Sequence, residues 1–404
     1  MGPQGGIKIR KENYVFEKWK NEFYSLYNMP SDMNTSFDNV FYEYVKTKLP
    51  DIKQLELNNS SANEKLYNRP FSSSEFDRIC NSLKQGKAAG PDMIPNEVLR
   101  HVGIRKPVVD FINMCFMNNV IPSVWRLSII SPIPKSASKD PYIPLNYRGI
   151  SLSSCMYKVY SSAINSRLSI YCEENGFLVD EQNGFRPDRS CQDHIYSLSS
   201  VIRNRKSRGL DTFCAFVDFQ KAFDWVSRDL LLYKLVTTFN IHGRLFNTLS
   251  TIYNSSISQI KLNGKLTPAF EVSSGVKQGD IVSPTLFSMY LNDLATGIKD
   301  LNCGIDINGH NLSILLYADD IVLMAADEMS LQKMLTFIRQ WCNKWRMAIN
   351  AEKTQVVHFR RPSTPRTNFN FTFGEKYLMI VPVYKYLGVQ FDEHLNFEKK
   401  MLPV

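Results

Sequence analysis

Two adjacent carboxylates stand in the middle of an apolar stretch of this chain. In LSILLYADDIVLMAAD (312–327), Asp319 and Asp320 separate one apolar run, residues 314–317, from another, residues 321–324. Both runs have the composition of strands, so the simplest prediction is a β-hairpin with the carboxylates at its tip. Asp is common in turns. This tip, however, lacks the Gly or Asn that favours a two-residue turn.

A third carboxylate lies at the end of another predicted strand. The β-branched and aromatic segment TFCAFVDF (212–219) contains Asp218. If the two strands are neighbours in one sheet, three carboxylates meet at one edge, and each raises the pKa of the others unless cations lie among them. Mg²⁺ is the expected cation, because it is usually bound by one or two carboxylates together with phosphate oxygens. Two such ions about 3.5–4 Å apart can hold the attacking and leaving oxygens of a phosphoryl transfer.

The elements around these carboxylates alternate between strands and helices. Strands are predicted from composition, and helices from apolar residues at helical spacing. The predicted strands are 212–219, the two arms of the hairpin 312–327, 354–359 and 384–391, and the predicted helices are 14–27, 229–239, 283–298 and 331–345. This order predicts an α/β or α+β sheet with helices packed on one face.

Composition narrows the class of protein. Lys plus Arg exceeds Asp plus Glu by 48 − 39 = 9 among 404 residues, and such an excess favours nucleic acid over membrane as a partner. The eight cysteines form no C-x-x-C and no zinc-ligand spacing with the histidines. No apolar run has the length of a membrane helix, and the N-terminus lacks the apolar core of a signal peptide. We therefore expect a soluble intracellular protein, nuclear or cytoplasmic.

A series of sequence blocks runs from residue 86 to residue 389. The blocks are GKAAGPDMIPNEVL (86–99), SPIPK (131–135), NYRGISL (146–152), EQNGFRPDRSCQDHI (181–195), FVDFQKAFDWV (216–226), GVKQGDIVSPTLFSMYLNDL (275–294), YADD (317–320), AINAEKTQVV (348–357) and YKYLGV (384–389). Their content and order resemble the reverse transcriptases of LINE-type, non-LTR retrotransposons. The resemblance covers about residues 70–390. Each block alone is a weak signal, whereas all of them in order are specific.

The resemblance implies an RNA-directed DNA polymerase. In such an enzyme a primer 3′-hydroxyl attacks the α-phosphate of a deoxynucleotide on an RNA template, with two Mg²⁺ ions that Mn²⁺ can replace. It places the metal site on Asp218, Asp319 and Asp320, with help from the main-chain carbonyl of Phe219. Lys353 matches a lysine proposed to protonate the departing pyrophosphate. The alternative for Lys353 is an ordinary solvated lysine.

The same resemblance implies a nucleotide pocket. Phe223 matches a bulky residue that excludes a 2′-hydroxyl, and Gln278 with Gly279 matches the floor of the pocket. Lys135 and Arg148 match basic residues that grip the incoming triphosphate. The alternatives are core packing for Phe223, a plain turn at Gln278–Gly279, and ordinary surface charge for the two basic residues.

Three further expectations concern the surroundings of this pocket. Tyr386, Leu387 and Gly388 in YKYLGV resemble the primer grip, or else belong to a plain core strand. Asp224 is expected to cap the helix that follows it. The basic segments VIRNRKSRG (201–209) and HFRRPSTPR (358–366) either follow a phosphate backbone or are solvated faces.

The implied architecture is an α+β right-hand polymerase with fingers and palm, the palm being an antiparallel sheet backed by helices, as in RNA-recognition folds. The expected parts are an N-terminal helical extension or interdomain segment (1–50), a polar linker (51–70), fingers with interleaved palm elements (71–210), the palm with the catalytic site (211–395) and a truncated start of the thumb (396–404). A thumb is thus expected to be absent or truncated, and the upstream endonuclease and downstream thumb of a parent element to be missing.

Two other classes compete with a working polymerase. The first is a non-catalytic nucleic-acid-binding relic of a retroelement that lacks a working thumb. The second is an RNA-dependent RNA polymerase or a group II intron-type protein. The ring of Phe223 disfavours ribonucleotide use, and the chain ends before a maturase segment. The expected partners are an RNA template, a DNA primer and dNTPs, and no membrane.

Overall fold

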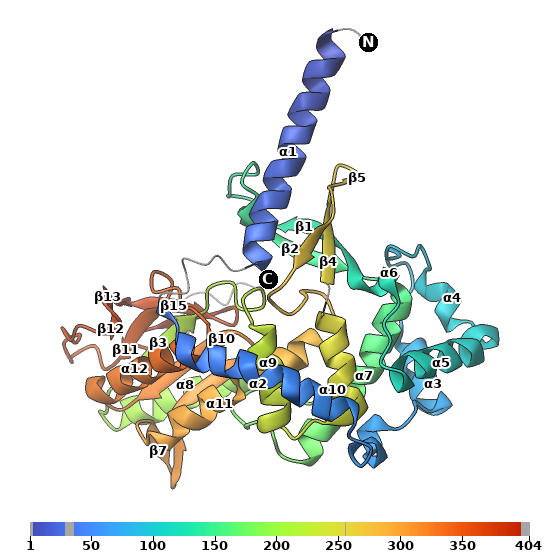
Figure 1. Cartoon of the computed structure of the whole chain (residues 1–404). Coiled ribbons are helices and arrows are strands. Elements are labelled where there is room, and N and C mark those ends of the chain that lie inside the picture. Colours follow the sequence, from blue (N-terminus) through green and yellow to red (C-terminus); the bar gives the residue numbers. More distant parts are fainter. Residues whose placement is uncertain (1–2, 29–35, 255, 397–404) are drawn as a thin grey trace. The chain divides into compact units, whose positions relative to one another are not determined.

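The computed structural model describes residues 3–28, 36–254 and 256–396 (Figure 1). These residues form two compact units. The first unit comprises 1–35, 39–175 and 223–286, and the second comprises 36–38, 176–222 and 287–404. The helix α11 (Ser283–Asp300) begins in the first unit and ends in the second.

The first unit combines many helices with a small mixed sheet. Its helices are α1 (Pro3–Tyr27), α2 (Asn39–Leu57), α3 (Ser73–Ser82), α4 (Asn96–Arg100), α5 (Val102–Met117), α6 (Ser123–Arg126), α7 (Cys155–Glu174), α9 (Arg228–Thr237) and α10 (Gly243–Tyr253). Its strands are β1 (Leu127–Pro134), β2 (Tyr147–Leu152), β4 (Ser256–Leu262), β5 (Lys265–Leu266) and β6 (Phe270–Val272). The sheet has the order β2-β1-β4-β5, β6 also pairs with β4, and the β1–β4 pair is parallel.

The helix α1 covers this sheet with the apolar face that its sequence predicts. Trp19, Phe23 and Leu26 are buried in one cluster with Ile130 of β1 and Ile260 of β4. The spacing of the three α1 residues places them on one side of a helix. The predicted helix over residues 14–27 is therefore confirmed as a docking helix.

Hydrogen bonds connect the polar segment 51–70 to the start of α10. The helix α2 continues to Leu57, and two short 3₁₀ turns follow, at Ala62–Glu64 and Leu66–Asn68. The buried side-chain amide of Asn68 donates to the carbonyls of Ala62 and His242, and its oxygen accepts the amide of Leu245 at 2.7 Å. A buried polar side chain with its hydrogen bonds made fixes this connection to the helix.

The second unit is built on a five-stranded sheet. Its order is β14-β11-β3-β10-β9, antiparallel except for the parallel β11–β14 pair. The elements of this unit are α8 (Cys191–Ser207), β3 (Thr212–Asp218), β7 (Ile305–Ile307), β8 (His310–Leu312), β9 (Ile314–Tyr317), β10 (Asp320–Ala325), α12 (Glu328–Trp345), β11 (Gln355–Phe359), β12 (Thr372–Phe373), β13 (Lys376–Tyr377), β14 (Met379–Ile380), β15 (Val383–Tyr386) and β16 (Val389–Asp392).

Helices cover both faces of this sheet. On one face, Leu198 and Ile202 of α8 share a core cluster with Cys214 and Phe216 of β3. The helix α12 contacts β10 and β3, and the ring centroids of its Trp341 and of Phe219 are 6.4 Å apart. Phe219 lies an odd number of residues from Cys214 and Phe216 and so belongs to the opposite face. The expectation of helices on one face alone is therefore wrong, and so is that of a purely antiparallel sheet.

The class of the fold agrees with the sequence. The described residues form a mixed α+β structure with open sheets. The strands predicted at 212–219 and 354–359, the hairpin at 312–327 and the helix at 331–345 are confirmed. The single strand predicted at 384–391 is instead the hairpin of β15 and β16, which turns at Leu387 and Gly388. No helix in the described part of the chain is both long enough and apolar enough to cross a membrane.

Candidate active site

The strands β3 and β10 bring acidic residues to one edge of the second unit's sheet. Asp218 ends β3 and Asp320 begins β10, and the two residues are directly opposite each other in the antiparallel register. Residues in such a pair have Cβ atoms about 4.5–5.5 Å apart and point to the same face. Asp319 immediately precedes Asp320 in the connection from β9. The two carboxylate-bearing strands are thus neighbours, as the sequence predicted.

The connection between β9 and β10 is a two-residue turn under strain. Tyr317 pairs directly with Asp320, so only Ala318 and Asp319 lie between the strands. Ala318 has a φ of +58°, in the left-handed region that residues with a Cβ rarely adopt. Strained backbone of this kind persists only where neighbouring structure holds it, and it is found disproportionately at functional sites.

The charges at this edge are compensated only in part. Partial burial, followed by the negative charges of Asp319 and Asp218, raises the pKa of Asp320 to about 6. Burial also raises the pKa of Asp218, and Lys353 opposes that increase. The ammonium of Lys353 lies 3.6 Å from Asp218 Oδ2, and its side chain is 67% exposed. Lys353 is therefore both solvated and next to the carboxylates.

The residues at this edge fit a divalent cation by their chemistry. Facing carboxylates provide the hard oxygen ligands that Mg²⁺ prefers, and burial raises the pKa of both Asp218 and Asp320. Within residues 3–28, 36–254 and 256–396, no three His, Cys, Asp or Glu residues are grouped closely enough to hold a metal ion. Mg²⁺ is usually bound by one or two carboxylates together with phosphate oxygens and water, and the facing carboxylates of Asp218 and Asp320 are ligands of that kind.

The hairpin β15–β16 lies beside the same carboxylates. The ring of Tyr384 stacks on Phe216 with centroids 4.2 Å apart. Burial, followed by the charges of Asp320 and Asp218, raises the pKa of the Tyr384 hydroxyl to about 12. Tyr384 lies two residues before Tyr386 and so shares its face of the strand, a relation that the alternation of a strand already predicts.

The three residues expected in a primer grip differ in their surroundings. Tyr386 is buried in the core, and its hydroxyl lies 3.4 Å from His194 Nδ1. Leu387 and Gly388 form the turn of the hairpin, with φ values of +45° and +87°. Tyr386 is thus a core residue, as the alternative interpretation expected, whereas the turn beyond it reaches the surface at Gly388.

In the first unit, Gln278 and Gly279 belong to a turn that several hydrogen bonds hold. Gln278 Nε2 donates to Asp224 Oδ1 at 2.8 Å, and the Gln278 carbonyl accepts the amide of Ser151 at 2.8 Å. Gly279 has a φ of +99°, and a Cβ there would lie 3.1 Å from the Ser151 carbonyl oxygen. A side chain at Gly279 is therefore disfavoured by the left-handed conformation and crowded by the close approach of β2.

Phe223 is joined to the same turn. Its carbonyl accepts the amide of Val276 at 2.9 Å, and its side chain is half-buried. Asp224 holds Gln278 and does not cap the next helix, because the N-cap of α9 is Ser227, whose Oγ accepts the amide of Leu230. The expectation for Asp224 is therefore wrong.

Lys135 and Arg148 lie on one hairpin of the first unit. Arg148 of β2 pairs with Ile133 of β1, and the amide of Lys135, just beyond β1, donates to the Asn146 carbonyl at 2.9 Å. Both side chains are exposed, and Lys135 Nζ donates to the Leu145 carbonyl at 2.8 Å. The structure thus brings these two predicted residues to the same exposed surface of the hairpin.

The predicted site residues are divided between the two units. The second unit contains Asp218, Phe219, Asp319, Asp320, Lys353, Tyr386, Leu387 and Gly388, and the first unit contains Lys135, Arg148, Phe223, Gln278 and Gly279.

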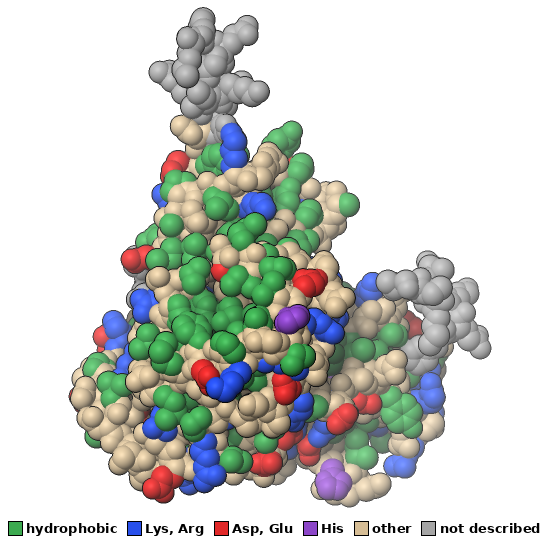
Figure 2. All heavy atoms as spheres, turned by 90° about the vertical axis from the view of Figure 1, so that its right-hand side faces the viewer, with side chains coloured by type: hydrophobic (Ala, Val, Ile, Leu, Met, Phe, Trp, Pro, Cys, Tyr) green, Lys and Arg blue, Asp and Glu red, His purple; other side chains and the backbone are tan. Residues whose placement is uncertain are grey.

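Arginines of the two basic segments, 201–209 and 358–366, form hydrogen bonds between the segments and ion pairs with acidic neighbours. Arg361 donates from Nε to the Lys206 carbonyl at 3.0 Å and from Nη2 to the Ser207 carbonyl at 2.6 Å, which closes the C-terminal end of α8. Arg366 forms an ion pair with Glu393 at 2.6 Å. These arginines thus have roles within the fold. On the face drawn in Figure 2, basic and acidic side chains are interspersed among hydrophobic ones.

Comparison with known proteins identifies relatives over most of the chain. A family model described as "Reverse transcriptase (RNA-dependent DNA polymerase)" matches residues 133–391. The chain is 26% identical over 338 residues to the RNA-directed DNA polymerase from mobile element jockey of Drosophila melanogaster, a match that covers 80% of this chain and 35% of the relative. It is 25% identical over 382 residues to the probable RNA-directed DNA polymerase from transposon X-element of the same organism, covering 88% of this chain and 39% of the relative.

One further relative and one solved structure are also similar to this chain. The Pol polyprotein from the retrotransposable element R2DM of Drosophila melanogaster is 24% identical over 326 residues, covering 78% of this chain and 30% of the relative. Among solved structures, apo telomerase from Candida tropicalis, truncated from its C-terminal domain, has a TM-score of 0.46 and 12% identity, covering 69% of this chain and 55% of that one. The chain spans about a third of the length of the curated relatives.

Proposed function

Because the chain belongs to the reverse transcriptase family, in its non-LTR retrotransposon branch, we propose that it is an RNA-directed DNA polymerase fragment. It extends a primer 3′-hydroxyl with dNTPs on an RNA template. The observation that supports this proposal most directly is the pairing of Asp218 with Asp320 at the sheet edge, next to the strained turn that carries Asp319.

The residues of the second unit would carry the chemistry. Asp218 and Asp319 are the main ligands for Mg²⁺, assisted by Asp320 and by the carbonyl of Phe219. When bound, two Mg²⁺ ions, or Mn²⁺ in their place, neutralise charge on the reacting phosphate oxygens. Lys353, 3.6 Å from Asp218, holds a proton on an exposed ammonium that can be passed to the departing pyrophosphate. The turn at Leu387 and Gly388 supports the primer 3′ end, with Tyr386 anchoring it in the core.

The residues of the first unit would select and hold the nucleotide. The half-buried ring of Phe223 excludes a 2′-hydroxyl by its volume, and Gln278 with Gly279 provides a floor without side-chain obstruction. Lys135 and Arg148, exposed on one hairpin, contact the triphosphate, Lys as a point charge and Arg as a planar fork. In this proposal residues 71–210 form mostly fingers and residues 211–395 the palm.

A primer-extension assay tests the proposal. The chain is given a homopolymer RNA template with a DNA primer, with and without Mg²⁺, and with dNTPs or rNTPs. We expect Mg²⁺-dependent extension that prefers dNTPs, and loss of extension in Asp319→Ala. Asp300→Ala, which changes an exposed carboxylate at the end of α11, serves as the matched control. Extension retained in Asp319→Ala would contradict the assignment.

Two other outcomes point to the competing classes. Template binding by the unmodified chain without any Mg²⁺-dependent extension would indicate a non-catalytic nucleic-acid-binding relic. Equal incorporation of rNTPs and dNTPs would indicate an RNA-dependent RNA polymerase instead, and would show that Phe223 does not act as the barrier to a 2′-hydroxyl.

A further inference from the structure

A short segment before α8 lies along the free side of the catalytic hairpin. Residues 181–184 run beside β9, with a parallel bridge between Gln182 and Leu316. The amide of Leu316 donates to the Glu181 carbonyl at 2.8 Å, and the amide of Asn183 donates to the Leu316 carbonyl at 2.9 Å. The edge strand of the sheet is therefore paired at the point where it enters the turn.

The side chain of Gln182 extends this pairing into the turn itself. Its Oε1 accepts the amide of Ala318 at 3.1 Å and the amide of Gly184 at 2.8 Å. The residue is 2% exposed, and its Nε2 is buried without a hydrogen-bond partner among the described residues. A buried donor left unpaired is destabilising. Gln182 therefore stabilises the turn through its acceptor oxygen, which accepts a hydrogen bond from the Ala318 main-chain amide.

The neighbours of Gln182 fix where that oxygen lies. A Cβ on Gly184 would stand 2.2 Å from the Ala318 nitrogen, so only glycine allows the segment to approach the turn this closely. Arg186 Nη1 donates to the carbonyls of Val179 and Gln182, at 2.7 and 3.2 Å. Glu181 forms an ion pair with Lys299 of α11 at 2.8 Å. The segment is thus anchored independently of the hairpin that it contacts.

We propose that Gln182 is a positioning residue for the catalytic turn: by holding the Ala318 amide it maintains the left-handed conformation of Ala318 and so sets the direction of the Asp319 carboxylate. The inference rests on the proposed function, since it assigns a purpose to a turn whose acidic residue binds the metal. A strained conformation such as that of Ala318 persists only where neighbouring groups hold it. The Gln182 oxygen is such a group, because it accepts a hydrogen bond from the Ala318 main-chain amide.

The test compares variants at Gln182 with a matched glutamine elsewhere in the same unit. Gln182→Met keeps the length of the side chain and removes the acceptor, whereas Gln182→Glu keeps an acceptor oxygen. The control is Gln332→Ala on α12, because Gln332 also makes two main-chain hydrogen bonds, accepting the Thr372 amide at 2.8 Å and donating to the Thr372 carbonyl at 3.0 Å.

Three measurements are made on the full chain. Hydrogen exchange of the Ala318 amide reports the contact itself, Mn²⁺ binding followed by electron paramagnetic resonance reports the carboxylates, and primer extension gives kcat and KM. For Gln182→Met we expect faster exchange at Ala318, weaker Mn²⁺ binding and a kcat lowered by at least about tenfold, with the KM for dNTP within about twofold of the unmodified chain. Gln182→Glu should keep the Ala318 amide protected.

The control separates positioning from stability alone. Gln332→Ala should lower the melting temperature and leave Ala318 exchange, Mn²⁺ binding and kcat unchanged. Equal behaviour of Gln182→Met and Gln332→Ala would overturn the proposal. If Gln182→Met does not fold, Gln182→Asn, whose shorter side chain cannot reach both amides, is measured in its place. If the unmodified chain extends no primer, the proposed function fails, and hydrogen exchange with Mn²⁺ binding still decides the role of Gln182.

Discussion

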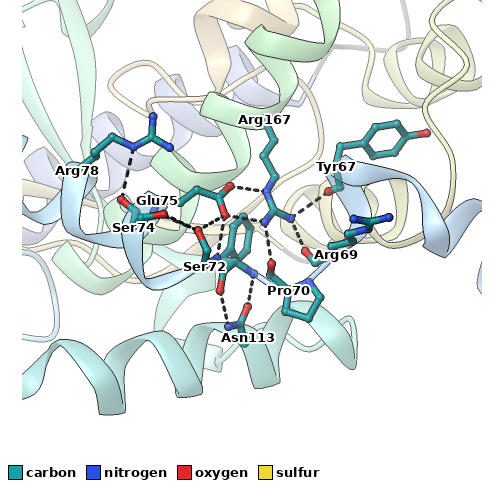
Figure 3. Close-up of polar contacts among 10 residues, drawn as sticks. Tyr67, Arg69, Pro70, Ser72, Ser74, Glu75, Arg78, Asn113 and Arg167 are labelled. Carbon is teal, nitrogen blue, oxygen red and sulfur yellow. Dashed lines mark hydrogen bonds and ion pairs between the residues drawn. The ribbon is translucent and has the colours of Figure 1, made fainter.

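Two clusters of charged side chains in this protein differ in how their charge is compensated. In the first unit, the guanidinium of Arg167 is 9% exposed and surrounded by acceptors (Figure 3). It forms two hydrogen bonds with the Glu75 carboxylate, at 2.8 and 3.0 Å, and others with main-chain carbonyls including that of Pro70 at 2.9 Å. Its carbon also lies 4.0 Å from the centre of the Phe71 ring. Here a buried charge is satisfied entirely by the fold.

At the acidic edge of the second unit, like charges lie side by side. Asp218 and Asp320 face each other across two strands, Asp319 adds a third carboxylate, and the exposed ammonium of Lys353 lies 3.6 Å from Asp218. Like charges held together raise one another's pKa values. Charge satisfied within the fold, as at Arg167, serves stability, whereas under the proposed function the charge at the acidic edge is balanced by a metal ion from solution.

Removing one acidic group should affect activity far more than folding. Asp218→Asn is expected to lower primer extension by at least about 1,000-fold, because charge neutralisation by the metal contributes several kcal/mol to such reactions. The free energy of unfolding without metal should stay equal or rise slightly, since repulsion among the carboxylates is relieved. Extension rates and chemical denaturation measure the two effects, with Asp300→Asn as control. A large loss of unfolding free energy in Asp218→Asn would show that the acidic edge also contributes to stability, and would contradict the difference between the two clusters.

Removing the arginine of the other cluster should have the reverse effect. Arg167→Met removes the charged partner of Glu75 and one donor from several main-chain carbonyls, and breaking a buried ion pair in this way costs about 3–5 kcal/mol of unfolding free energy. Extension per folded molecule should be unchanged. The control is Lys106→Met, which breaks the exposed pair with Asp110 at 3.7 Å and should cost no more than about 1 kcal/mol. Equal losses of unfolding free energy in the two variants, measured by denaturation, would show that the buried cluster contributes no more to stability than an exposed ion pair.

Divalent metal should distinguish the clusters without any change of fold. An ion present at about 100 times its dissociation constant stabilises a protein by about 2.7 kcal/mol. We expect Mg²⁺ or Mn²⁺ to raise the melting temperature of the unmodified chain and of Arg167→Met, and to leave that of Asp218→Asn almost unchanged. Thermal unfolding across a metal titration measures this. A shift that persists in Asp218→Asn would mean that the ion binds somewhere other than the acidic edge.

The parts of this site that the sequence revealed are those with local signals. The strands β3 and β10 were predictable because each is an apolar, β-branched run that meets a carboxylate. The uninterrupted apolar run TFCAFV, buried along its length, also carried the signal for helices on both faces of the sheet, because alternation disappears when both faces are covered. The expectation of helices on one side does not account for this run.

Other features depended on contacts between distant residues. The Oε1 of Gln182 reaches the Ala318 amide across 136 positions of sequence, and Arg167 reaches Glu75 across 92. Neither residue differs by type from many surface residues, and only the folded chain shows that both are buried. The two-residue turn at Ala318 was also unexpected, because turn preferences argue against it and the neighbouring segment overrides them.

Acid should weaken the satisfied cluster in a defined range of pH. Burial alone would raise the pKa of Glu75, but the hydrogen bonds and charge of Arg167 and the hydrogen bonds of Ser72 outweigh it and lower the pKa from 4.5 to about 2. The unfolded chain therefore takes up this proton first, so the stabilisation is complete above pH 4.5 and is lost as the pH falls toward 2. Because the Glu75 side chain is 25% exposed, solvent screening limits the loss to about 1–2 kcal/mol.

Denaturation of the unmodified chain and of Glu75→Gln between pH 5 and pH 2.5 measures this effect, and the variant should lack this part of the pH dependence. Parallel curves for the two proteins would show that the Arg167 cluster does not draw its stability from an ionised Glu75. The contrast with the acidic edge would then rest on the uncharged hydrogen bonds of Arg167 alone.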